Sequence, residues 1–241
     1  LGWCKEAYFS LGAYQLLPQD IDRILYLDAG DILVVDDIEP YYNGDFEGKS
    51  LLVTGTKYKG TDDDCKLLDS DDLMNPQILP TIIQGIFNSG SYVMNLNKMR
   101  RDACQMEDYI RLASQLKQIS VSQNRAFLGD QGLLSAAYVG DVKYYGYPEI
   151  VDLWYMPYNF CMWYFDCMKT KPHYRPGIIH YAGANLAFKP WRGKYPIFLE
   201  RFQNMEELYD LNQLELGQAE YYYLWHEYAM KAEKTLQLCL E

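Results

Sequence analysis

The segment from Arg23 to Val35 constrains the fold more than any other part of the chain. It holds an apolar run, Ile24 to Leu27, that ends on Asp28, and a second apolar run that begins directly after Asp31. The first run is short, rich in large apolar side chains and preceded by charged residues, so it predicts a buried strand. Because an unpaired buried charge would be neutralised, the two carboxylates are expected at a sheet edge that faces a cleft.

These two carboxylates have two interpretations. A carboxylate pair at the carboxyl end of a strand can hold Mg²⁺ or Mn²⁺, which take oxygen ligands and can complete their shell with a bound diphosphate. The alternative is an Asp-Gly turn between two strands, in which Asp28 and Asp31 only form the turn. Short Asp motifs are common, so both interpretations stay open on this segment alone.

The length and the charge of the chain limit the class of protein. A chain of 241 residues, of which 49% are hydrophobic, suits one large α/β domain, perhaps with a small appendage. The formal net charge of −11 argues against nucleic acid and against an anionic membrane surface as partners. An anionic substrate would therefore need a metal ion or a small basic cluster. The six cysteines include no CxxC pair, which gives no zinc signature, and reduced thiols in a cytoplasm are the default.

Three further motifs follow along the chain. The first, Phe87-Asn88-Ser89-Gly90, precedes an apolar strand and predicts a loop whose backbone can approach a ligand closely. The second, Asp130-Gln131, opens a predicted helix with Asp130 as its N-cap. The third is the strand Ile178 to Tyr181, which contains His180 and runs into a loop with a basic patch.

Each member of these motifs also has an ordinary structural interpretation. His180 alone fits a buried core histidine better than a metal ligand, and Asp130 fits a helix cap. Gly183 fits a plain loop glycine, and Lys189 fits an ordinary surface lysine. No single motif decides between these interpretations.

Taken together and in this order, the motifs resemble family 8 glycosyltransferases over about residues 5–195. These are retaining, metal-dependent enzymes that use nucleotide sugars, and they include bacterial lipopolysaccharide galactosyl- and glucosyltransferases, galactinol synthase and glycogenin. The resemblance implies an α/β protein of the GT-A type, with a Rossmann-like mixed sheet flanked by helices. It also implies a hexosyltransferase that takes glucose or galactose from UDP-glucose or UDP-galactose.

The resemblance sets the expected domains as well. A nucleotide-sugar transferase domain would span residues 1–199, and a C-terminal helical extension would span residues 200–241. The strands that hold uracil and ribose in the family would precede residue 1. We therefore expect an N-terminal portion to be missing, a sheet edge to be exposed, and the chain as given to be inactive without that portion.

The resemblance implies a metal site. Asp28 matches the first Asp of the family's Asp-x-Asp motif, Asp31 matches the last, and His180 matches the histidine that joins them on Mn²⁺ (or Mg²⁺). A neutral imidazole suits Mn²⁺ better than Mg²⁺. The spacing here has one residue more than in the family, and Gly30 can absorb it as a bulge or a tight turn.

The resemblance also assigns residues to the substrates. Asn88, Ser89 and Gly90 match the loop along the donor sugar and the acceptor, while Gly183 and Lys189 match contacts to the diphosphate. Asp130 matches a residue that grips sugar hydroxyls near the anomeric carbon. Gln131 matches the residue on the opposite face from the leaving group. An amide is a poor nucleophile, so we expect attack from the side on which UDP leaves, with Gln131 stabilising the sugar cation.

Two other classes stay open as alternatives. A phosphatase of the haloacid-dehalogenase type would use the first Asp as nucleophile, but it gives no role to His180 or to residues 87–90. A non-catalytic relative that binds sugar or a partner is favoured by the altered Asp spacing and by the loss of a donor-side Arg. Glu6, Ala7 and Tyr8 stand where that Arg is expected.

The acceptor and the location follow from bacterial relatives. We expect a glycan or a glycolipid as acceptor and a cytoplasmic protein, peripheral to the inner membrane at most. The C-terminal segment carries Tyr and Trp residues but is net acidic, which predicts weak or no membrane association.

Overall fold

The computed structural model describes residues 5–30, 32–54, 71–83, 85–102, 105–122, 129–145, 149–151, 177–181 and 215–240. The chain divides into two compact units. The first comprises Leu1–Asp28 and Asp37–Tyr147, and the second comprises Ala29–Asp36 and Pro148–Glu241.

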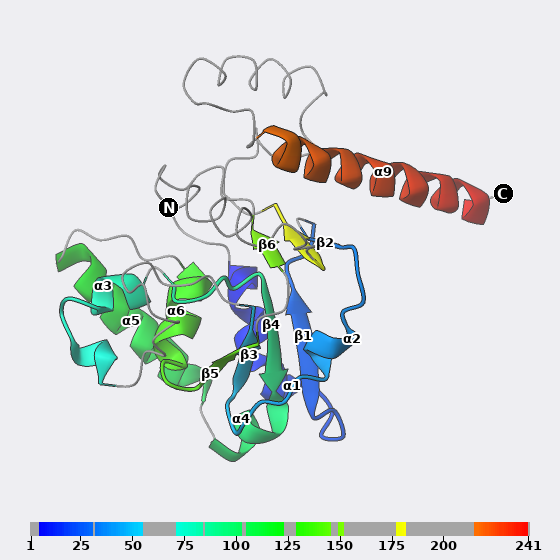
Figure 1. Ribbon diagram of the computed structural model, residues 1–241. Coiled ribbons are helices and arrows are strands. Elements are labelled where there is room, and N and C mark those ends of the chain that lie inside the picture. Colours follow the sequence, from blue (N-terminus) through cyan, green and yellow to red (C-terminus); the bar gives the residue numbers. More distant parts are fainter. Residues whose placement is uncertain are drawn as a thin grey trace. The chain divides into compact units, whose positions relative to one another are not determined.

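A four-stranded mixed sheet forms the centre of the first unit (Figure 1). Its strand order is β1 (Arg23–Leu27), β4 (Ser91–Asn95), β3 (Leu51–Val53) and β5 (Val142–Tyr144). Strand β4 is antiparallel to both β1 and β3, whereas β3 and β5 are parallel. The apolar run before Asp28 is therefore a strand, as its sequence predicts, but its residues are half-buried and not buried, because β1 is the outer strand in this order. The mixed α/β class is confirmed.

Helices flank this sheet. They are η1 (Lys5–Gly12), α1 (Ala13–Leu16), α2 (Glu39–Tyr42), η2 (Asp72–Met74), α3 (Leu79–Ile82), α4 (Leu96–Asp102), α5 (Met106–Ser122) and α6 (Gly129–Ala137). Helices α3, α5 and α6 gather on one side of the sheet (Figure 1). One continuous core joins them to the strands, and its fully buried side chains include Leu51, Val53, Ile82, Phe87, Met94 and Leu134.

Two helices differ from the sequence prediction. Residues 4–17 are expected as one helix, but η1 is a 3₁₀ helix followed by a single α-helical turn. Residues 97–119 are expected as one long helix, but α4 ends at Asp102 and α5 begins at Met106. The Asp108 carboxylate accepts a hydrogen bond from the backbone N–H of Gln105 at 2.9 Å. That bond satisfies a donor that a helix start leaves unpaired, so a new helix begins there.

The described residues of the second unit form a three-stranded sheet and a long helix. Strand β7 (Ile178–His180) lies between β2 (Ile32–Val34), to which it is antiparallel, and β6 (Glu149–Val151), to which it is parallel. Helix α9 (Glu215–Leu240) follows, and its Trp225 packs against Ile179 and Tyr181.

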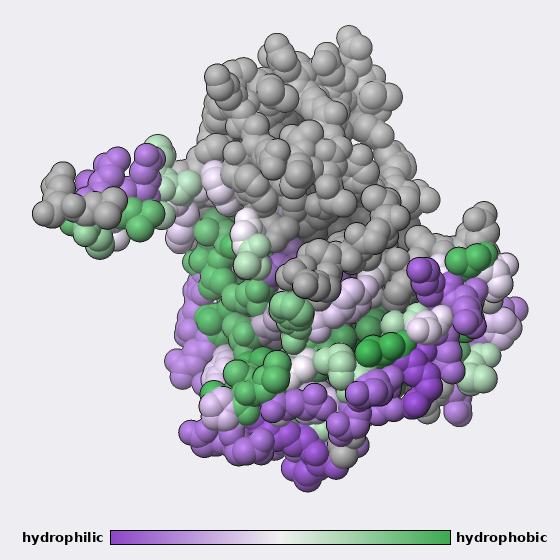
Figure 2. All heavy atoms as spheres, turned by 180° about the vertical axis from the view of Figure 1, so that it is seen from behind, coloured by the Kyte–Doolittle hydropathy of each residue, from purple (hydrophilic) through white to green (hydrophobic). Residues whose placement is uncertain are grey.

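The C-terminal half of α9 is exposed. Hydrophobic and hydrophilic residues lie next to each other along it (Figure 2), and Met230, Leu236 and Leu238 are among the exposed hydrophobic ones. A search of the helices that the structure describes finds none with the length and apolar content needed to cross a bilayer.

Candidate functional site

Three segments of the first unit, far apart in the sequence, meet at one end of the four-stranded sheet. Leu27 of β1 pairs with Ser91 of β4, so Asp28 comes directly beside the loop that precedes β4. The backbone N–H of Asp28 donates to the carbonyl oxygen of Gly90 at 2.9 Å. The third segment is the first turn of α6, which bonds to the same loop. The predicted Asp motif and the predicted Asn-Ser-Gly loop are thus neighbours.

The Asp28 side chain is oriented by an aromatic pair. Its carboxylate, which is half-buried, accepts a hydrogen bond from the Tyr26 hydroxyl at 2.9 Å. Tyr26 lies two residues earlier in β1, and side chains with this spacing share one face of a strand. The Tyr26 ring stacks on Tyr92 of the neighbouring strand, with ring centroids 4.8 Å apart. The stacking holds the hydroxyl in place against Asp28.

Tyr92 lies inside the site. Burial raises the pKa of its hydroxyl well above the ordinary value, and the Ser10 hydroxyl opposes that shift. The Tyr26 hydroxyl and the carboxylates of Asp130 and Asp28 raise the pKa further. Tyr92 is therefore a buried, neutral side chain, and both carboxylates are close enough to influence the pKa of its hydroxyl.

The Asn88-Ser89-Gly90 loop is tied to itself and to α6. The Asn88 side-chain oxygen accepts a hydrogen bond from the Gly90 N–H at 2.8 Å, which closes a local turn. The Ser89 N–H donates to the Gln131 side-chain oxygen at 3.3 Å. The Ser89 hydroxyl bonds to the Asp130 carboxylate. These bonds bring together five of the residues that the resemblance assigns to the substrates.

Asp130 is half-buried at the start of α6. Helix α6 begins at Gly129, so Asp130 lies in the first helical turn and not at the predicted N-cap. Burial raises the pKa of its carboxyl group. Hydrogen bonds from Ser89 and from the backbone N–H groups of Asp130 and Gln131 oppose that shift. A carboxylate held this way still has acceptor capacity for hydroxyl groups.

His180, the other predicted metal ligand among the described residues, belongs to the second unit. His180 ends β7, is 3% exposed, and pairs with Ile32, the residue that follows Asp31 in the sequence. Gly30 has a φ of +97°, so the Asp loop does contain the glycine turn that the spacing predicts. Asp31, Gly183 and Lys189 lie outside the described residues.

The ligand types suit a divalent transition metal. A carboxylate and an imidazole are the donors that Mn²⁺ accepts. Within the part of the chain that the structure describes, which excludes Asp31, no three His, Cys, Asp or Glu side chains are grouped as metal ligands. The metal site stays a prediction.

Sequence reasoning misses three members of this site. Tyr26 could have been found, because it stands two residues before Asp28 and strand alternation puts both side chains on one face. Tyr92 becomes visible only through the strand register, in which it pairs with Tyr26. The third is Gly85, where a Cβ would lie only 2.5 Å from Cγ of Gln131. Nothing in the sequence signals this contact, because it depends on the path of a side chain from α6.

Comparison with known proteins gives one family. The sequence model described as Glycosyl transferase family 8 matches residues 2–194. The curated protein "Probable galacturonosyltransferase-like 4" of Arabidopsis thaliana is 28% identical over 135 residues, which are 53% of this chain and 35% of that protein. The chain therefore spans about a third of the length of this relative.

Solved structures of glycosyltransferases also match. The galactosyltransferase LgtC, in complex with donor and acceptor sugar analogues, is 22% identical with a TM-score of 0.48, and the match covers 82% of this chain and 65% of LgtC. The glycosyltransferase GlyE of Streptococcus pneumoniae TIGR4 is 18% identical with a TM-score of 0.44, over 78% of this chain and 38% of GlyE.

Proposed function

Because the chain belongs to glycosyltransferase family 8, we propose that it transfers a hexose, glucose or galactose, from a UDP-sugar to a glycan or glycolipid acceptor with retention of the anomeric configuration. One observation carries this proposal furthest. Asp28, the Asn88-Ser89-Gly90 loop and the Asp130-Gln131 turn come from three distant parts of the sequence, and hydrogen bonds join them at one end of the sheet.

We propose that Asp28, Asp31 and His180 hold Mn²⁺, or Mg²⁺ in its place. Support comes from the ligand types and from the sequence order, because Asp31 directly precedes the strand that pairs with His180. The ion would neutralise charge on the departing diphosphate. Gly183 and Lys189 are proposed to contact the same diphosphate, which the net negative charge of the chain would otherwise repel.

The residues of the chain then have separate tasks. Asp130 accepts hydrogen bonds from hydroxyls of the donor sugar, and the 88–90 loop lies along the sugar and the acceptor. The acceptor hydroxyl attacks the anomeric carbon from the side on which UDP leaves. The bond from that carbon to the phosphate oxygen breaks, and the departing phosphate takes the hydroxyl proton. The Gln131 amide oxygen stabilises positive charge on the sugar ring.

The domain boundaries, the location in the cell and the membrane association are also proposals. We propose residues 1–199 as the transferase domain and residues 200–241, which include α9, as a helical extension. We also propose a cytoplasmic protein with weak or no membrane association, on the strength of the acidic C-terminal segment.

The proposed function is tested with the full-length protein, UDP-glucose and UDP-galactose. We expect release of UDP from one of them in the presence of Mn²⁺, loss of that release with EDTA, and recovery when Mn²⁺ is added back. No release from either sugar nucleotide, with binding of one of them retained, would favour a non-catalytic relative. Release of phosphate from an aryl phosphate with Mg²⁺ would favour the phosphatase.

Tyr26→Phe removes the hydroxyl that orients Asp28 and leaves the stacked ring in place. We expect the Mn²⁺ concentration for half-maximal UDP release to rise about tenfold, because losing a group that orients a metal ligand weakens metal binding about 10- to 100-fold. The measurement is a Mn²⁺ titration of UDP release. Tyr42→Phe is the matched control, because the Tyr42 hydroxyl bonds to the Arg23 carbonyl oxygen and not to Asp28. Equal Mn²⁺ dependence in both variants would contradict the role of Tyr26.

A further inference from the structure

Gly85 lies against the side chain of Gln131. An ideal Cβ built on Gly85 would be 2.5 Å from Cγ and 2.7 Å from Cδ of Gln131, and closer still to its Nε2. Real Cβ atoms essentially never approach other heavy atoms this closely. All three of the nearest atoms belong to this one side chain. Gln131 therefore occupies the space that any side chain at position 85 would need.

The segment that contains Gly85 contacts the Gln131 side chain at two residues. The Ser89 N–H donates to Oε1 at 3.3 Å. Nε2 and Cγ lie where a Cβ of residue 85 would be. Since Gly85 and Ser89 are four residues apart in one segment, the amide sits in a cradle made by that segment.

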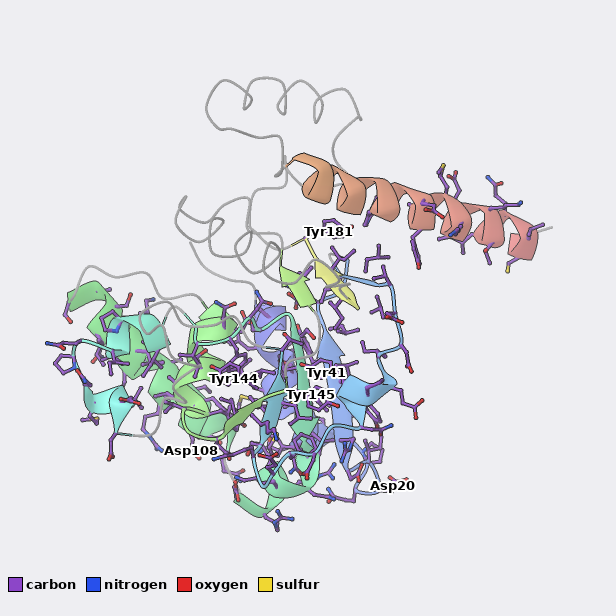
Figure 3. The ribbon with its side chains drawn as sticks, in the orientation of Figure 1. Asp20, Tyr41, Asp108, Tyr144, Tyr145 and Tyr181 are labelled. Atoms are coloured by element: carbon purple, nitrogen blue, oxygen red, sulfur yellow. The ribbon has the colours of Figure 1, made fainter. Side chains whose placement is uncertain are left out.

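The cradle itself has little freedom to move. The Ile86 N–H donates to the Ser135 hydroxyl at 3.0 Å, and the Ile86 carbonyl accepts from the Tyr144 hydroxyl at 3.0 Å (Tyr144 is labelled in Figure 3). Ser135 is fully buried and follows Gln131 by four residues, so both side chains leave the same face of α6. A side chain at position 85 would therefore displace Gln131 before it displaced the backbone.

We propose that Gly85 is a positioning residue for Gln131, and that the absence of a side chain there sets where the amide lies at the donor sugar. The part that concerns sugar transfer rests on the proposed function above. Gly85 also has a φ of +110°, where any other residue is strained. A test must therefore separate backbone strain from the contact with Gln131.

Gly48→Ala supplies the matched control. Gly48 also has a positive φ, +77°, but a Cβ there meets nothing within 4 Å. Both alanine variants are expected to lose a few degrees of Tm from backbone strain. Gly85→Ala is expected to lose more Tm, and its kcat for sugar transfer should fall about 10- to 100-fold, because a misplacement of about 1 Å near the reacting atoms can have that effect. Gly48→Ala should keep its kcat.

A double-mutant cycle with Gln131→Ala decides whether Gly85 acts through Gln131. In the Gln131→Ala background the contact is gone, so Gly85→Ala should lower Tm only as much as Gly48→Ala does and should not reduce kcat further. This double variant also covers the case in which Gly85→Ala alone does not fold.

Two other results would overturn the proposal in different ways. If Gly85→Ala lowers Tm equally in both backgrounds, Gly85 does not position Gln131, whatever the activity. If the parent protein transfers no sugar, the proposed function fails, and with it the role of Gly85 in transfer. The Tm cycle still decides the contact in that case.

Discussion

Asp130→Asn should lower sugar transfer about 100-fold and at the same time raise the Tm of the protein at neutral pH. The loss of transfer follows because an amide cannot supply the negative charge that the proposed sugar contact uses, and a single charged contact at a reacting centre contributes on this scale. The gain in stability follows because burial is the largest influence on the Asp130 carboxyl and raises its pKa. Ionising that group in the folded protein is therefore unfavourable, and asparagine avoids it.

The effect of Asp130 on stability depends on pH, and its sign follows from the direction of the pKa shift. A raised pKa means that the folded state binds the proton more tightly than the unfolded state. The parent protein therefore loses stability as the pH rises from the ordinary carboxyl pKa, about 4, through the raised value. The Tm advantage of Asp130→Asn should be largest above the raised pKa and should shrink as the pH falls toward and below about 4, where the carboxyl group gains its proton in both the folded and the unfolded state.

Thermal unfolding and UDP release at several pH values measure both effects. Asp20→Asn is the control, since Asp20 is exposed and lies away from the site residues in sequence; neither Tm nor transfer should change appreciably. A fall in Tm for Asp130→Asn at pH 7 would show that the hydrogen bonds to the carboxylate outweigh its burial.

Arg100→Met should lower the free energy of unfolding by about 3 kcal/mol. The Arg100 guanidinium donates to five backbone carbonyl oxygens, those of Tyr14, Leu17, Pro18, Gln19 and Ile21. The bonds to Tyr14, Leu17 and Ile21 are partly buried, whereas the other two are exposed and can be replaced by water. Hydrogen bonds to a charged group contribute about 1.5–3 kcal/mol each, and part of that is recovered when the carbonyls become hydrated.

Arg101→Met is the matched control for this prediction. Arg101 is the next residue of α4 and is exposed, so its loss should change the free energy of unfolding by no more than about 0.5 kcal/mol. Urea unfolding of the two variants makes the comparison. Equal midpoints would show that the segment from Tyr14 to Ile21, which leads into β1, holds its shape without the guanidinium.

Much of the fold around the site is predictable because local patterns agree with the tertiary structure there. The apolar runs before Asp28 and after Gly90 are strands β1 and β4, as the sequence predicts. The split between α4 and α5 escapes prediction, because the apolar spacing continues across it and a single capping bond at Gln105 starts the new helix.

The candidate site is also predictable only in part: its residues can be named from the sequence, but their arrangement cannot. Asp28, Asn88, Ser89, Asp130 and Gln131 stand in motifs, and each can be named from the sequence by resemblance. The distances between these residues cannot be predicted from the sequence. They depend on the pairing of Leu27 with Ser91 and on the packing of α6 on the 85–90 segment, which are long-range contacts.

The sequence by itself determined the family, the strand that ends in a carboxylate and the glycine after it that can absorb the extra residue, but not that this strand is only half-buried. Alternation of apolar side chains, short-range turn chemistry and motif order are properties of neighbouring residues, so they can be read along the chain. Only the tertiary structure decided that Tyr92 stacks on Tyr26 and lies near both carboxylates, and that Gly85 makes room for Gln131. Those relations depend on strand register and side-chain packing, which bring together residues up to about a hundred positions apart.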